Sequence, residues 1–185
     1  MSEFNNEQIK FFTKSLVDSG KLDSMFKLMS NDKDFIKQSM KSKPGVLAHA
    51  SAELRDDKQF MTEIFESHSN CGHLLQYASD RLRDDKEFVS KVLEGGGFAF
   101  EHASLRLRAD KEIGLQAVKH GWWDAVRDFG SQEIKGIVSW KSTDEAINAL
   151  EDAILTEKRI EAHEKLQSTL SQKGPAPKQK LGMKL

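Results

Sequence analysis

The sequence is poor in cysteine, with only Cys71 among its 185 residues. A single thiol excludes a disulfide within the chain and a metal site built from several cysteines, and it is typical of a reducing compartment. No apolar run approaches the roughly 18 residues that span a bilayer, and the first ten residues lack the basic and apolar regions of a secretory signal. We therefore expect a cytoplasmic protein without a transmembrane segment. Export as an effector by a non-classical signal stays open.

An excess of charge of one sign is also missing, because 28 Lys and Arg oppose 29 Asp and Glu, for a formal net charge of −1. This balance argues against a globally basic nucleic-acid binder and leaves only a local basic patch. Proline is scarce as well, with none between Pro44 and Pro175. Because proline breaks helix interiors, this long stretch is free to be helical.

What the sequence does contain is an internal repeat. Three segments align without gaps: LAHASAELRDDKQFM at 47–61, LQYASDRLRDDKEFV at 75–89 and FEHASLRLRADKEIG at 100–114. A weaker copy begins at Asn31, and an Asp-Lys pair recurs in all four copies at steps of 25, 28 and 25 residues. Periods of this length are typical of helical units that stack on one another.

Each unit is predicted to contain two short helices. Asn31, Asp56 and Asp84 are expected to be N-caps of the first helices, since each has an acceptor side chain three residues later. Ala109 breaks this pattern, so the fourth helix is expected to start at Asp110. Glycines expected to end these helices in the left-handed region are Gly20, Gly45, Gly72, Gly97 and Gly121. The second helix repeats an apolar triplet at i, i+3 and i+7, which predicts one buried face. The triplets are Leu47, Ala50 and Leu54, then Leu75, Ala78 and Leu82, then Phe100, Ala103 and Leu107.

Because two short helices cannot bury such faces alone, the sequence predicts an all-α fold of stacked two-helix repeats of about 25–28 residues, similar to an α-solenoid. The repeat domain is expected over 1–140, with units near 5–30, 31–55, 56–83, 84–108 and 109–130. A long C-terminal helix is expected over 143–171, and Glu157 interrupts its apolar positions near the midpoint. We expect its first half to pack on the stack and its second half to project or to pair with something. A flexible basic tail over 172–185 completes the chain.

The recurring core [HY]-A-S-x-x-L-R-x-D-K-[EQ] resembles the DUF4116 repeat, a helical unit of unknown biochemical function. The resemblance covers about 31–121, and 5–30 less clearly. Members of this family occur widely in bacterial proteins, including some that resemble secreted effectors, and the family has no defined catalytic residues. The resemblance therefore implies a helical repeat fold and offers no catalytic site.

Arg55, Arg83 and Arg108 are candidates for partner binding because they recur at one position of the repeat. A row of guanidinium groups suits phosphates or the carboxylates of a partner. Each arginine also stands close to an aspartate in the sequence, so a ladder of ion pairs between stacked units is the alternative.

Further candidates lie where the repeat pattern ends. Trp122 and Trp123 either cover the end of the stack or form an exposed contact. In the tail, Lys178, Lys180 and Lys184 suit nucleic acid, an anionic membrane or an acidic groove, and the alternative is a tail that only keeps the chain in solution.

The segment SHSNCGH at 67–73 contains His68, Cys71 and His73, which are weak candidates for zinc ligands. A fourth ligand is missing, and the segment aligns with the glycine turn LEGGG at 93–97, so a loop between helices is the alternative. We expect no metal and no cofactor.

Catalysis is not expected, because the His-Ala-Ser tripeptides recur in the repeat whereas an active site is needed once. The predicted function is a non-enzymatic protein–protein interaction module with an unknown partner. A nucleic-acid-associated protein that uses the lysine-rich tail and the arginine edge is the first alternative. An effector or anti-defence protein that blocks a host enzyme is the second. Self-association through the C-terminal helix is predicted as a further contact.

Overall fold

The computed structural model contains only helices among the regular elements that it describes. The described residues are 29–68, 71–96, 98–139 and 141–172. The predicted tail and most of the unit predicted near 5–30 lie outside them. Within these ranges no helix combines the length and the apolar character that crossing a membrane requires.

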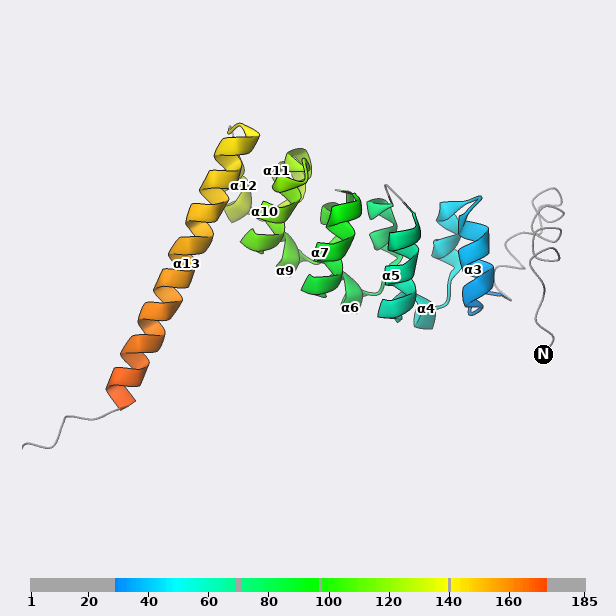
Figure 1. Ribbon diagram of the computed structural model, residues 1–185, viewed down its shortest axis with the longest axis horizontal. Helices are drawn as coiled ribbons and strands as arrows, with labels where there is room; N and C mark the ends of the chain where they lie inside the picture. Colours follow the sequence, from blue (N-terminus) through cyan, green and yellow to red (C-terminus); the bar gives the residue numbers. More distant parts are fainter. Residues whose placement is uncertain (1–28, 69–70, 97, 140, 173–185) are drawn as a thin grey trace, which may run out of the picture.

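Four units repeat one order of segments (Figure 1). The first helices are α3 (Lys33–Met40), α5 (Lys58–Ser67), α7 (Lys86–Gly95) and α10 (Lys111–Lys119). The second segments are the 3-10 helices η1 (Pro44–His49) and η2 (Gly72–Tyr77) and the α-helices α8 (Phe98–His102) and α11 (Trp123–Phe129). The third helices are α4 (Ala52–Asp56), α6 (Asp80–Arg83), α9 (Leu105–Arg108) and α12 (Gln132–Val138). The fourth unit thus extends past the expected boundary at 130.

The units stack side by side in chain order, which confirms the predicted all-α repeat architecture. Figure 1 shows the first helices in a row from α3 to α10, with α4, α6 and α9 along the lower edge of the row. The second segments contact one another in turn and form a second layer. One continuous cluster of buried residues runs through the stack from Phe35 to Leu150.

The second helix of each unit is interrupted, so the prediction of one continuous helix was wrong. Ser51, Ser79 and Ser104 have extended backbone and start a new helix, and each hydroxyl accepts a hydrogen bond of 3.2 Å from the backbone N–H three residues later. Serine favours this position because its side chain replaces the missing helical acceptor. The predicted burial is nevertheless correct, since all nine triplet residues are at most 5% exposed.

The N-caps of the first helices lie one residue later than predicted. In the first three units they are Asp32, Asp57 and Asp85, whereas the fourth helix is capped by Asp110, where its start was expected. Each carboxylate accepts from the backbone N–H of the third residue that follows, at 2.9–3.2 Å. The aspartate of each Asp-Lys pair is therefore the cap, and Asn31, Asp56 and Asp84 are available for contacts between units. The glycine prediction also needs correction. Gly121, with φ of 87°, is the one glycine in the left-handed region among the described residues, and Gly20 and Gly97 lie outside them.

The C-terminal helix α13 (Thr143–Gln172) is 30 residues long, as predicted to within one residue. Ser142 and Glu145 form a capping box at its start, with the Ser142 N–H donating to the Glu145 carboxylate at 2.8 Å. The first half packs on α10 and α12 and buries Ala146 and Leu150. From 155 to 171 every residue is exposed, and Figure 1 shows this half running out beyond the stack.

Contacts between units and a candidate binding surface

The Asp-Lys pairs form a ladder of ion pairs along the stack. Its rungs are Lys33–Asp57 at 2.6 Å, Lys58–Asp85 at 2.9 Å and Lys86–Asp110 at 2.7 Å. Each of these aspartates caps its own helix and also binds the lysine of the preceding unit. The hydrogen bond from Lys33 keeps the pKa of the Asp57 carboxyl below its usual value. Because such partly exposed pairs are each worth about 0–1 kcal/mol, the ladder specifies how the units align more than it stabilises them.

The ladder ends at Lys111, whose side chain is only 8% exposed. In place of the aspartate of a further unit, Glu133 of α12 lies 2.6 Å from the Lys111 ammonium, and Glu157 of α13 binds the same ammonium. Lys158 of α13 lies 2.8 Å from Glu112, and hydrogen bonds from Lys158 and Lys86 lower the pKa of the Glu112 carboxyl to about 2. Glu157, the charged residue that interrupts the apolar pattern of α13, therefore holds α13 against the last unit of the stack.

A second set of contacts joins the third helices. The backbone N–H of Ser79 donates to the Arg55 carbonyl at 3.0 Å, and the Ser79 hydroxyl donates to Asp56. Arg81 Nε lies 2.9 Å from the same Asp56 carboxylate, and hydrogen bonds from Ser79 and Arg81 lower its pKa. The next joint repeats this arrangement with Ser104, Arg83, Asp84 and Arg106. The arginines that pair between units are thus Arg81 and Arg106, and the predicted alternative assigned this role to the wrong arginines.

These joints were missed from the sequence, although the chain carries a signal for them. The residue before each Asp-Lys pair changes together with the residue two positions after the next capping serine. The matched pairs are Asn31 with Glu53, Asp56 with Arg81, Asp84 with Arg106, and Ala109 with Glu133. Arginine occurs only where the preceding unit supplies an aspartate, so comparison of the four units indicates which positions meet.

Arg55, Arg83 and Arg108, here called the arginine row, occupy equivalent positions near the ends of α4, α6 and α9. All three side chains are half-buried, and the Nε of each is buried without a hydrogen-bond partner. Arg83 binds Asp80, which is 92% exposed, and Arg108 Nη1 donates to the Phe129 carbonyl at 3.3 Å. The row therefore takes no part in the ion pairs between units.

The surroundings of the arginine row combine positive charge with apolar surface. Leu105 lies three residues before Arg108 on the same helix and is 78% exposed. His102 lies near Arg83 and Arg108, and burial, together with these two positive charges, lowers the pKa of its imidazole. Arginine beside exposed apolar side chains is typical of protein interfaces.

The tryptophan pair lies at the start of α11. Trp122 and Trp123 are both half-buried and pack against the core. The guanidinium of Arg127 lies over the ring of Trp123, 4.8 Å from its centroid. The two indole rings therefore shield the core from solvent at this end of the stack.

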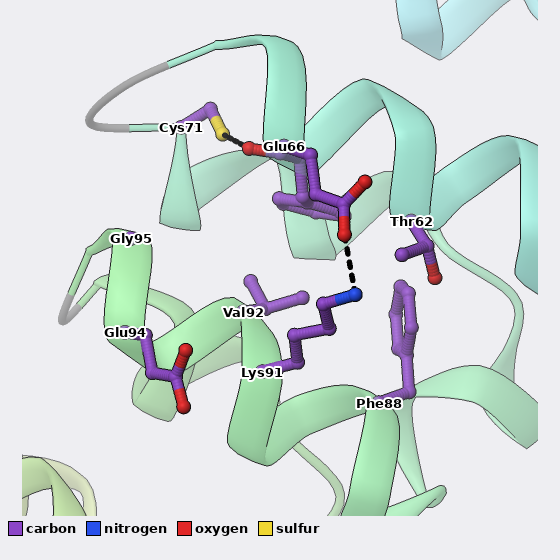
Figure 2. Close-up of a pocket in the computed structure, with 9 residues that line it drawn as sticks. Thr62, Glu66, Cys71, Phe88, Lys91, Val92, Glu94 and Gly95 are labelled. Atoms are coloured by element: carbon purple, nitrogen blue, oxygen red, sulfur yellow. Dashed lines mark hydrogen bonds and ion pairs between the residues drawn. The ribbon is translucent and has the colours of Figure 1, made fainter.

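A pocket of about 270 Å³ lies between α5 and α7 (Figure 2). Phe88 and Val92 line it, and the ion pair of Glu66 with Lys91 crosses it. The Cys71 thiol donates to the His68 carbonyl at 2.8 Å, and burial raises its pKa. A thiol that stays protonated is a poor nucleophile, so Cys71 is not an activated group of this pocket.

The structure does not bring the three weak zinc candidates together. His68 Nδ1 lies 3.0 Å from the Ile64 carbonyl oxygen, Cys71 is buried, and His73 is exposed. Across the described ranges no three His, Cys, Asp or Glu residues form a group that could hold a metal ion. The tail candidates Lys178, Lys180 and Lys184 lie outside the described residues.

Comparison with family models identifies the repeat. The model described as "Domain of unknown function (DUF4116)" matches at 32–71, 69–108 and 85–124. These overlapping matches contain the Lys–Asp ladder and the arginine row, and together they cover just over half of the 185 residues. Neither a curated protein nor a solved structure matches the chain. Repeated matches on a stack of helical units show that the chain belongs to the DUF4116 family.

Proposed function

We propose that the chain is a non-enzymatic module that binds another protein through the arginine row. One observation carries this proposal. The joints between units use their own lysines and Arg81 and Arg106 for ion pairs. Among the described residues, no carboxylate of the next unit pairs with the arginine that recurs at one position of three successive units, and Arg108 contacts only the Phe129 backbone carbonyl there. Guanidinium groups repeated in this way suit the carboxylates of a partner protein.

The hydroxyl and thiol groups of the repeats support a role without catalysis. Ser51 and Ser104 cap helices and donate their hydroxyl hydrogens to Asn31 and Asp84, so they are occupied in the fold. The one cysteine is buried with a raised pKa. An activated thiol has a lowered pKa, whereas burial raises the pKa of the Cys71 thiol.

Nucleic acid is the competing partner, because guanidinium groups also bind phosphates. The near-zero net charge of the chain and the acidic residues along the Lys–Asp ladder favour a protein partner. The two partners differ in salt dependence, since binding to duplex DNA weakens with a log–log slope of about −0.9 per neutralised phosphate.

The test is a nuclease-treated pull-down from extract of the source cells. The wild-type chain is compared with R55E/R83E and with the control K41E/R159E, which makes the same charge change at exposed positions outside the row. We expect one stoichiometric protein on the wild type and on the control, and its loss from R55E/R83E at unchanged helicity. Retention of that protein by R55E/R83E would refute the proposal.

A further inference from the structure

We infer that the ligand of the arginine row is an extended acidic segment that places a carboxylate at every third residue. This inference rests on the proposed function and specifies the chemistry of the partner. The segment lies along the stack and supplies one carboxylate to each of Arg55, Arg83 and Arg108.

The spacing of the units supports this register. Arg55 and Arg83 are tied to the next unit by the same backbone hydrogen bond, 3.0 Å and 2.9 Å long, so the row advances by one unit at a time. Packed helices lie about 8–10 Å apart. A segment in the extended polyproline II conformation has three residues per turn and rises about 3.1 Å per residue, so every third side chain lies on the same face and three residues cover about 9 Å. A carboxylate at positions i, i+3 and i+6 therefore meets all three arginines.

The shape of the surface favours an extended ligand over a helix. An acidic helix with carboxylates at i, i+7 and i+14 has a similar spacing, but a helix about 10 Å wide needs an apolar groove along its whole length. Beside the row, the position three residues before each arginine is Ala52, Asp80 or Leu105. Only Leu105 offers a large exposed apolar side chain, so the apolar surface does not continue along the three units.

The arginines are prepared for such a ligand. A buried Nε holds the base of each guanidinium against the stack, which reduces the side-chain freedom that binding would otherwise remove. Arg83 Nη2 binds the exposed Asp80, so its terminal nitrogens lie at the surface. An exposed pair of this kind is worth little, and a carboxylate of the ligand replaces Asp80 at low cost.

The experiment measures binding of synthetic peptides to the full chain at about 50 mM salt by fluorescence anisotropy. One peptide has Glu at i, i+3 and i+6, a second has the same composition with three adjacent Glu, and a third is a helix former with Glu at i, i+7 and i+14. We expect the first to bind about tenfold more tightly than either control, because only it pairs with three arginines. R83E should abolish this preference, and R83K should weaken it, because lysine lacks the two-pronged geometry.

Each other outcome overturns the inference in its own way. Equal affinities for all peptides mean that charge alone binds, and tighter binding of the i+7 peptide means that the ligand is a helix. Absence of binding by every peptide means that the row does not take acidic segments. The proposed function is judged separately, by loss of the captured protein in R55E/R83E. The proposed function therefore stands even if the i, i+3, i+6 spacing is wrong, and it is refuted if R55E/R83E retains the captured protein. Circular dichroism of each variant confirms that the stack is folded.

Discussion

At the scale of single residues, Gly72 allows the backbone of the neighbouring unit to pack closely. Gly72 begins η2, and a Cβ built there would lie 2.3 Å from the Gly96 carbonyl oxygen and 2.8 Å from the Ala99 backbone nitrogen. Both obstacles are backbone atoms, which cannot rotate aside. The sequence suggested a left-handed turn at this glycine, whereas the structure requires glycine because of the approach of the next unit.

We predict that Gly72→Ala lowers the free energy of unfolding by about 1–3 kcal/mol, the usual cost of overpacking. The measurement is urea denaturation followed by circular dichroism. Gly45→Ala is the matched control, since a Cβ at Gly45 meets no atom within 4 Å. An equal effect of the two substitutions would show that the close approach of Gly72 to the next unit is not the cause.

The matched pairs at the joints lead to a second prediction at this scale. R81E places a carboxylate beside Asp56 and should lower the free energy of unfolding, because repulsion replaces an ion pair. The double variant D56N/R81E recreates the pair of the first joint and should recover most of that loss. A double-mutant cycle in urea measures the coupling. Additive effects of the two changes would contradict the pairing.

At the scale of the element, α13 is docked by charge as well as by apolar packing. Glu112 of α10 accepts Lys158 of α13 and Lys86 of α7, and the pKa of its carboxyl falls from 4.5 to about 2. A carboxyl with a lowered pKa in the folded state contributes stability above its unfolded pKa. That contribution disappears as the pH falls from about 4.5 towards 2.

We therefore predict that E112Q is less stable than the wild type at pH 6 and that the difference closes as the pH approaches 2. Thermal midpoints at pH 2, 3, 4.5 and 6 measure it. The difference between the two chains is the readout, because other carboxyls titrate in both. A difference that is the same at every pH would mean that Glu112 acts through packing instead of charge.

The elements also show which parts of the fold local sequence patterns can predict. Apolar spacing predicted the buried face correctly because Leu47, Ala50 and Leu54 stay on the inner side even though Ser51 breaks the helix between them. The break itself has no signature in that spacing. Similarly, Asp56 and Asp57 are equally good caps by local sequence alone. The residue that caps the helix is Asp57, which also contacts Lys33 of the preceding unit. Contacts between units decide what the local sequence leaves undetermined.

The candidate surface follows the same rule. The sequence identified Arg55, Arg83 and Arg108 as a recurring set, because recurrence is visible in one chain. It did not identify Arg81 and Arg106 as the inter-unit partners, since their acceptors lie 25 and 22 residues away. Only after these pairs are placed does it become clear that the ion pairs between units do not use the arginine row.

At the scale of the whole molecule, the stack is a sum of similar joints. Each unit contacts mainly its neighbours, so stability is expected to grow with the number of units. A duplicate of 57–84 inserted after Asp84 would meet Asp84 with a copy of Arg81, and Lys58 with a copy of Asp57. Both joints would therefore keep the pairing that the natural chain uses.

We predict that this longer chain folds, with more helix and a thermal midpoint no lower than that of the natural protein. Circular dichroism and small-angle scattering measure the helix content and the added length. An insert of the same 28 residues with Arg81→Glu in the copy is the control, and it should have a lower midpoint. Aggregation or a lower midpoint of the unmodified insert would show that the units are not interchangeable.

The matched pairs also have a consequence for inheritance. A gene that gains or loses the unit 57–84 by unequal recombination keeps an aspartate facing an arginine at the new joint, so selection on folding does not oppose that change. A substitution on one side of a joint, in contrast, removes the pair until a compensating substitution follows on the other side. Across generations, the number of copies of this unit is therefore free to drift while the paired positions within it change together.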